Sequence, residues 1–216
     1  MNKKITWILL SFLLIFTASA WTISNSDMVK SANKLADMWI INNHSDSPSE
    51  YNLSDNVLRQ EIAKMSAFIA QKNLWLQLVK SCENKFWDIT KEKPNDWVCI
   101  YVESLVKKWL ISANKAFNPE NFISKTEALK MMLEAAWFTD IYSDASKWQE
   151  QVVWFAVERW ILDSFSDYNT LATRGFIFTI ADATIKKEEE IRKQKQEWFY
   201  SDEVLYEIES ILSIYQ

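Results

Sequence analysis

Residues at the spacing of an α-helix share one face in several parts of the chain. Three such sets are Ile62, Met65, Ser66 and Ile69; Val98, Tyr101, Val102 and Leu105; and Leu129, Met132, Leu133 and Ala136. A period of 3.6 residues is typical of helices that bury one side, and such a stripe is more often core than contact with a cofactor. The pattern therefore predicts an all-α protein.

A short pattern recurs three times around these helices. Trp39, Trp109 and Trp160 each follow a helical stretch and precede two apolar residues, and a polar loop, a basic residue and a second helix come after them. A single pair of helices buries little apolar surface, so we expect the three helix-loop-helix repeats to pack together. The expected units are residues 21–75, 76–140 and 141–185, followed by a charged linker and a C-terminal helix in 186–216.

The first twenty residues have the layout of a secretory signal peptide. Lys3 and Lys4 precede an apolar run from Ile5 to Phe16, and an A-x-A site ends at Ala20. A membrane anchor is the alternative, but the run is shorter than the roughly 20 residues that span a bilayer. We expect cleavage near Ala20, secretion to the cell surface and no transmembrane segment in the mature chain.

Charge and cysteine content narrow the function. Loss of residues 1–20 leaves 22 basic residues against 29 acidic ones, a net charge of −7, which does not suit a nucleic-acid binder. His44 is the single histidine and no C-x-x-C occurs, so neither a metal site nor a cofactor is expected. In a secreted protein Cys82 and Cys99 favour a disulfide, and two separate buried thiols are the alternative.

Glycine is almost absent and tryptophan is unusually common. The chain has 1 Gly and 12 Trp, where about 15 glycines are expected at average usage. Trp39, Trp109 and Trp160 stand just past helix ends, where glycine is favoured because it adopts the left-handed conformation at low cost. We therefore hypothesise that UGA codons, read as glycine in the host as in some uncultivated bacterial lineages, are written here as tryptophan. The candidate sites are Trp39, Trp75, Trp87, Trp109, Trp137 and Trp160.

Two other tryptophans are expected to be genuine. Trp97 and Trp148 each start an equivalent helix, at the same distance before Trp109 and Trp160. The alternative to recoding is a tryptophan-rich core or a surface on which sugar rings stack.

Motifs around the second helices point to a family. Phe117-Asn118-Pro119 precedes Ser124-Lys125-Thr126-Glu127, and Arg59-Gln60-Glu61 and Thr173-Arg174 hold the same place in the other repeats, although Phe176 replaces the acid there. With the three Trp-apolar-apolar sites taken as Gly-apolar-apolar, the chain resembles the S-layer homology (SLH) family over roughly residues 25–185.

The resemblance implies a fold and a role. SLH modules usually occur in threes as a pseudo-threefold helical body. Grooves between them hold secondary cell-wall polymers, often with pyruvylated sugars, or peptidoglycan-linked glycan, and the modules do no chemistry. By this resemblance we expect a non-catalytic anchor at the cell surface or S-layer, whose partner is an anionic or pyruvylated cell-wall glycan.

The candidate ligand-binding residues lie at the starts of the second helices: Arg59, Lys125, Arg174, Glu61, Glu127 and Thr173. Ser124-x-x-Glu127 is typical of a capping box. A cation in the first turn opposes the helix dipole at a cost of about 0.3–1 kcal/mol, so its repetition favours a binding role. A helix N-terminus with a guanidinium suits a carboxylate or phosphate, whereas Lys125 brings charge without a bidentate fork.

Glycan binding has three alternatives. Surface ion pairs with nearby acids would account for the basic residues without a ligand. A second function class is an exported scaffold of the cell envelope that uses its C-terminal helix, around Tyr206 to Tyr215, on a protein partner. A third is an enzyme with Glu61, Glu127 and Asp144 as paired carboxylates for glycan hydrolysis. Capping and ion pairing explain these acids more simply, so we expect no catalysis.

Overall fold

Helices connected by irregular loops form the whole described structure. The computed structural model describes residues 23–42, 44–89, 95–138, 141 and 143–199, and this part has no β-strand, only isolated bridges. The all-α prediction is confirmed. In chain order the elements are α1 (Asn25–Asp37), α2 (Arg59–Leu74), η1 (Asp96–Val98), α3 (Cys99–Lys107), α4 (Lys125–Ala135), η2 (Ala145–Lys147), α5 (Trp148–Glu158) and α6 (Arg174–Phe199).

The start of α4 has the predicted capping box. Ser124 Oγ accepts the N–H of Glu127 at 3.3 Å, and Glu127 Oε2 accepts the N–H of Ser124 at 3.1 Å. At α2, Glu61 Oε2 likewise accepts the N–H of Leu58 at 2.9 Å. These bonds satisfy amides that have no partner inside the helix, so each helix begins at a definite residue.

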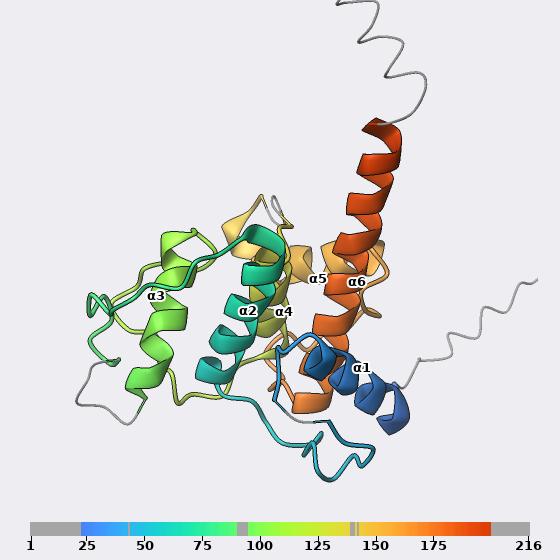
Figure 1. Ribbon diagram of the computed structural model, residues 1–216, viewed down its shortest axis with the longest axis horizontal. Helices are drawn as coiled ribbons and strands as arrows, with labels where there is room; N and C mark the ends of the chain where they lie inside the picture. Colours follow the sequence, from blue (N-terminus) through green and yellow to red (C-terminus); the bar gives the residue numbers. More distant parts are fainter. Residues whose placement is uncertain (1–22, 43, 90–94, 139–140, 142, 200–216) are drawn as a thin grey trace, which may run out of the picture.

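The predicted stripes form the core. All their members are buried except Tyr101, which is half-buried. Helix α2 packs against α4 and α4 against α6, while α3 lies on α2, α5 on α4 and α1 on α6 (Figure 1). The first helix of each expected repeat therefore packs on the second helix of another one, and the helices share one core.

Three loop segments are joined by backbone hydrogen bonds in a closed cycle. The N–H of Val57 donates to the carbonyl of Ala172, that of Ala172 to Ile123, and that of Ile123 to Val57, at 2.9–3.0 Å. Each of these residues precedes by two positions the first residue of α2, α6 or α4. The cycle therefore brings together the starts of three helices that are far apart in the sequence.

Five tryptophans have a left-handed backbone. They are Trp39, Trp75, Trp109, Trp137 and Trp160, with φ between 53° and 70° and exposed fractions of 64–93 %. L-residues with a Cβ rarely adopt this conformation and glycine adopts it freely, so the expected backbone geometry is confirmed at these sites. Trp87 is not among the positive-φ residues, although it is exposed. Trp97, in η1, and Trp148, the first residue of α5, stand at helix starts as expected.

Helix α6 continues without a break through the repeat boundary expected at residue 185. Its 26 residues include the charge-dense segment 186–196, and its outer end extends beyond the other helices (Figure 1). Among the described helices, none is both long and apolar enough to cross a membrane. The expected signal peptide and the expected helix around Tyr206 to Tyr215 lie outside the described residues.

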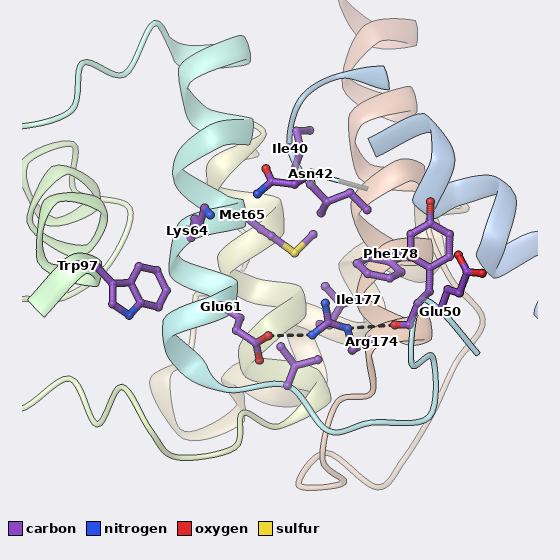
Figure 2. Close-up of a pocket in the computed structure, with 13 residues that line it drawn as sticks. Ile40, Asn42, Glu50, Glu61, Lys64, Met65, Trp97, Arg174, Ile177 and Phe178 are labelled. Atoms are coloured by element: carbon purple, nitrogen blue, oxygen red, sulfur yellow. Dashed lines mark hydrogen bonds and ion pairs between the residues drawn. The ribbon is translucent and has the colours of Figure 1, made fainter. Parts of the chain in front are cut away.

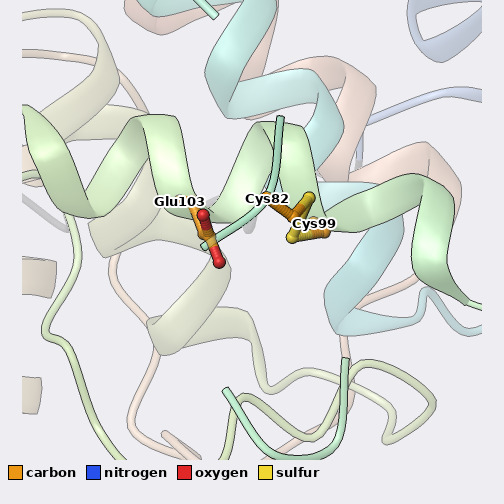
Figure 3. A group of neighbouring side chains, drawn as sticks. All are labelled: Cys82, Cys99 and Glu103. Carbon is orange, nitrogen blue, oxygen red and sulfur yellow. A yellow bond between two sulfur atoms is a disulfide. The ribbon is translucent and has the colours of Figure 1, made fainter. Parts of the chain in front are cut away.

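A disulfide joins Cys82 to Cys99, as predicted, and ties the segment after α2 to the start of α3 (Figure 3). Beside it the buried carboxylate of Glu103 accepts the N–H groups of Glu83 and Lys85 at 2.7 and 3.0 Å. Within the described residues, Cys82, Cys99 and Glu103 are close enough for metal ligation. The two sulfurs are bonded to each other, however, and so cannot serve as thiolate ligands.

Candidate functional site

Arg59 begins α2 but makes its side-chain contacts with the following repeat. Its Nε donates to the carbonyl oxygen of Phe117 at 3.0 Å, and its Nη1 donates to Glu127 Oε1 at 2.9 Å. The guanidinium also lies over the Phe117 ring, 5.2 Å from the ring centroid. The side chain therefore bridges the start of α2 and the start of α4.

Arg174, the first residue of α6, makes the corresponding two hydrogen bonds with the first repeat, while the ring beside it belongs to its own helix. Its Nε donates to the carbonyl oxygen of Tyr51 at 3.2 Å, and its Nη1 donates to Glu61 Oε1 at 2.9 Å. It lies 5.8 Å from the centroid of the Phe178 ring. Four of the six predicted site residues are thus brought together in two matching pairs, Arg59 with Glu127 and Arg174 with Glu61.

Each glutamate holds two partners with its two oxygens. Oε1 accepts from the arginine, while Oε2 accepts from the backbone at the start of its own helix. The paired side chains are 23 % and 41 % exposed for Arg59 and Glu127, and 36 % and 34 % for Arg174 and Glu61. Exposure of this degree limits each ion pair to about 1 kcal/mol. Ion pairing therefore accounts for part of the role of the arginines and fixes where each guanidinium lies.

Backbone amides do not add to the site at α2 or α6. The first two N–H groups of α2 donate to the carbonyls of Asn121 and Pro119, and the first two of α6 donate to those of Asp55 and Leu53. The expectation that these helix N-termini offer free amides to an anion is therefore wrong, because the loops of the hydrogen-bonded cycle already occupy them. An anion at these places has to be held by side chains.

A groove of about 410 Å³ opens beside Arg174 (Figure 2). Two cations, Arg174 and Lys64, and two carboxylates, Glu61 and Glu50, line it together with the indole of Trp97 and the ring of Phe178. Lys64 lies one turn after Glu61 on α2, and Trp97 belongs to η1. All three expected repeats therefore contribute to the walls of this groove, which we call the Arg174 groove.

A second groove, of about 290 Å³, opens beside Arg59, and we call it the Arg59 groove. Arg59, Glu127 and Lys130 line it with the indole of Trp148 and the ring of Phe117. Lys130 follows Glu127 by the three positions that separate Lys64 from Glu61. The two grooves thus share an arginine, a glutamate, a lysine and a tryptophan in corresponding places.

The lysine and the tryptophan of each groove were not predicted as site residues from the sequence. The signal for the lysines was present as the spacing Glu-x-x-Lys in Glu61 to Lys64 and in Glu127 to Lys130. Trp97 and Trp148 were recognised only as helix starts. Their role in the grooves depends on how the first helix of one repeat packs on the second helix of another, which the spacing along the chain does not contain.

Cationic groups dominate the polar lining of the Arg59 groove. Arg59 and Lys130 face the single carboxylate of Glu127 among its lining residues. Lys130 also pairs with Glu134 at 2.6 Å, and burial raises the pKa of Glu134 above its usual range.

In the described part of the chain, Nη2 of Arg59 and of Arg174 has no hydrogen-bond partner. A carboxylate or phosphate could take up these donors.

The remaining two predicted residues lie elsewhere. Lys125 begins α4, and its ammonium lies over the rings of Phe165 and Phe176, at 6.0 and 5.4 Å from their centroids. Thr173 Oγ1 accepts the N–H of Phe176 at 3.4 Å, a helix-capping contact. Neither residue is in a pair like those of Arg59 and Arg174.

The carboxylates considered for hydrolysis all have structural partners. Glu61 and Glu127 cap helices and hold arginines. Asp144 accepts from the side chain and the backbone of Ser146, and these bonds lower the pKa of its carboxyl group. A general acid for glycoside cleavage needs a raised pKa, so the perturbation at Asp144 has the wrong direction.

A scan of protein-family models finds no match for this chain, and a search of curated proteins finds none either. The function therefore has to be inferred from the two grooves and from the residues that line them.

Proposed function

We propose that this protein is a non-catalytic anchor at the cell surface, secreted through its N-terminal signal peptide, which binds an anionic cell-wall glycan in the Arg174 and Arg59 grooves. The observation that carries the proposal is the correspondence between the two grooves. An arginine, a glutamate, a lysine and a tryptophan recur in the same places, although they come from different parts of the chain. Packing alone does not require the same polar groove, with two half-buried cations, to be built twice.

The lining suits an acidic sugar. Each arginine has Nη2 donors directed to no protein partner in the described residues, and a lysine lies one turn away on the same helix as the glutamate. A carboxylate, such as that of a pyruvyl group, or a phosphate accepts from both cations. The indole of Trp97 or Trp148 offers a broad apolar face with one polar edge, which suits the apolar side of a sugar ring.

The pseudo-threefold SLH arrangement belongs to the same proposal. Three features support it: the closed cycle of hydrogen bonds through Val57, Ala172 and Ile123; the starts of α2, α4 and α6 beside that cycle; and the packing of α1 on α6, α3 on α2 and α5 on α4. In such a body each groove lies between neighbouring repeats, as the Arg174 and Arg59 grooves do for the expected repeat boundaries.

Co-sedimentation of the protein with washed, protein-free cell walls of the producing bacterium tests the proposed glycan binding. We expect the intact protein to pellet and Lys64→Ala to weaken binding, because it removes a cation of the Arg174 groove. Lys186→Ala, which changes an exposed lysine on α6 outside both grooves, is the matched control and should bind as the wild type does. Equal binding by Lys64→Ala and Lys186→Ala would count against the groove.

The arginines themselves need a separate control. Since Arg174 holds Tyr51 and Glu61, Arg174→Ala is expected to lower stability as well as binding. Thermal unfolding of this variant therefore has to show a folded protein at the assay temperature before a loss of binding is assigned to the groove.

The exported scaffold is the competing proposal, and the exposed outer end of α6 is the observation that favours it. A scaffold binds walls only through a protein partner. Retention on walls from which protein has been removed would refute it, whereas retention that requires untreated walls would refute glycan binding.

A further inference from the structure

The third position of the hydrogen-bonded cycle differs from the other two. Where Arg59 and Arg174 begin α2 and α6, Lys125 begins α4. An ammonium is a compact charge that lacks the planar fork with which arginine holds a carbonyl and a carboxylate together. Its Nζ instead lies over the rings of Phe165 and Phe176. We call this place the Lys125 junction.

The acid and the second cation are also replaced there. Two residues after the first residue of α2 and of α4 stand Glu61 and Glu127, but the same position of α6 is Phe176. Three residues further on, Lys64 and Lys130 correspond to Thr179, whose hydroxyl donates to the carbonyl of Gly175 at 2.9 Å. The Lys125 junction therefore lacks the carboxylate that positions a guanidinium and the lysine that accompanies it.

The tryptophan is replaced by an acid. Trp97 and Trp148 each precede a left-handed tryptophan by twelve positions, and the residue twelve positions before Trp39 is Asp27. Its carboxylate accepts from Ser24 and Lys30, and the hydroxyl of Ser24 lowers the pKa of this group. At neutral pH this position thus carries a negative charge, which repels an anionic sugar, instead of an indole.

Aromatic rings pack together at the Lys125 junction. Phe165 packs edge-on against both Tyr168 and Phe176, with ring centroids 6.2 Å apart in each pair. The ammonium of Lys125 lies over two of these rings, so the place that a guanidinium takes beside a carboxylate in the two grooves is here a contact between a cation and aromatic rings.

We infer that the protein binds two glycan segments and that the Lys125 junction is a structural contact between repeats instead of a third binding site. This inference rests on the proposed function and specifies its stoichiometry. Two sites on one rigid body make binding to a polymer bivalent. The second site then binds at a high effective concentration, which raises retention by about 10²–10⁴-fold over a single groove.

Co-sedimentation with washed, protein-free walls, followed over a range of wall concentrations, tests the inference with four single variants and one double variant. Trp97→Ala impairs the Arg174 groove and Trp148→Ala the Arg59 groove. Each is expected to weaken retention by at least about 10²-fold, and the double variant to abolish it. Lys125→Met, which keeps the aliphatic packing on the rings and removes the charge, should bind as the wild type does. Trp154→Ala, an exposed indole outside both grooves, is the matched control.

The outcomes distinguish the two-site inference from the proposed function. Weakening by Lys125→Met comparable to that by Trp97→Ala overturns the two-site inference and leaves glycan binding in the two grooves standing. Full retention by the double variant overturns the inference together with the assignment of binding to these two grooves. Absence of wild-type binding overturns the proposed function itself. Circular dichroism checks each variant for folding, and Lys64→Gln replaces Trp97→Ala if the helical signal of the latter falls.

Discussion

Replacing the five left-handed tryptophans with glycine should stabilise the protein. A residue with a Cβ costs roughly 1–2 kcal/mol in the left-handed region, whereas glycine occupies it freely. Glycine also gives the unfolded chain more freedom, at a cost of about 0.5–1 kcal/mol. Since the five indoles are 64–93 % exposed, their removal sacrifices little buried surface. The net gain is therefore roughly 0.5–1 kcal/mol at each site.

The five gains should nearly add. Residues far apart contribute independently, although Trp75 and Trp137 line one pocket and their effects can couple. The quintuple variant is expected to gain roughly 3–5 kcal/mol, which for a chain of this length corresponds to a rise in Tm of roughly 10 °C. Urea unfolding followed by circular dichroism, with the disulfide intact, measures the free energy of unfolding.

Two sets of controls isolate the backbone conformation. Trp→Ala at the same five sites removes the indole but keeps the Cβ, so it should recover much less stability than Trp→Gly. Trp97→Gly and Trp148→Gly, at sites where φ is not positive, should destabilise the protein instead. Equal gains from alanine and glycine, or destabilisation by glycine at the left-handed sites, would refute the reasoning. The gene gives an independent check: UGA codons are expected at the five sites and UGG at Trp97 and Trp148.

Three further measurements test other parts of the structure. Cys82→Ser with Cys99→Ser opens the disulfide and should cost about 3 kcal/mol in urea unfolding, a loss that reduction of the wild type should reproduce. Ser124→Ala removes the hydroxyl that caps α4 and should cost about 1 kcal/mol, with little change if the capping bond is absent in solution. Burial raises the pKa of Glu134, so the folded state holds its proton more tightly than the unfolded state. Wild-type stability should therefore fall relative to Glu134→Gln as pH rises above 4.5, and parallel profiles would contradict this.

Local patterns predicted the helices and their caps well. The stripe of Leu129, Met132 and Leu133 is buried, and Ser124 with Glu127 forms the expected capping box, because both features depend on residues within one or two helical turns. The disulfide was predictable from the number of cysteines together with the expectation of secretion. The positions of the left-handed tryptophans were predictable too, since helices commonly end with a left-handed residue just after their last turn.

The contacts of the arginines could not be predicted in this way. The sequence suggested that a cation at the start of α2 opposes the helix dipole and so has a ligand. In the structure Arg59 reaches Glu127, which is 68 positions away, and the amides beside it are occupied by loop carbonyls. Both facts depend on which helix start lies beside which, and the closed cycle of loops decides this. No periodicity within one repeat contains that information.

The two departures from the repeated motif are physically linked. Phe176 in place of an acid and Lys125 in place of an arginine each look like a degraded motif when considered alone. In the structure the ammonium of Lys125 lies 5.4 Å from the centroid of the Phe176 ring. Lys125 thus keeps an aromatic contact, as Arg59 and Arg174 do, but a ring stands where those arginines have a glutamate. An arginine opposite Phe176 would lose its carboxylate partner, and a glutamate opposite Lys125 would lose the guanidinium that donates to a carbonyl and a carboxylate at once. The two replacements therefore make sense together as one contact between repeats, and they set this helix start apart from those of Arg59 and Arg174, for which we propose ligand binding.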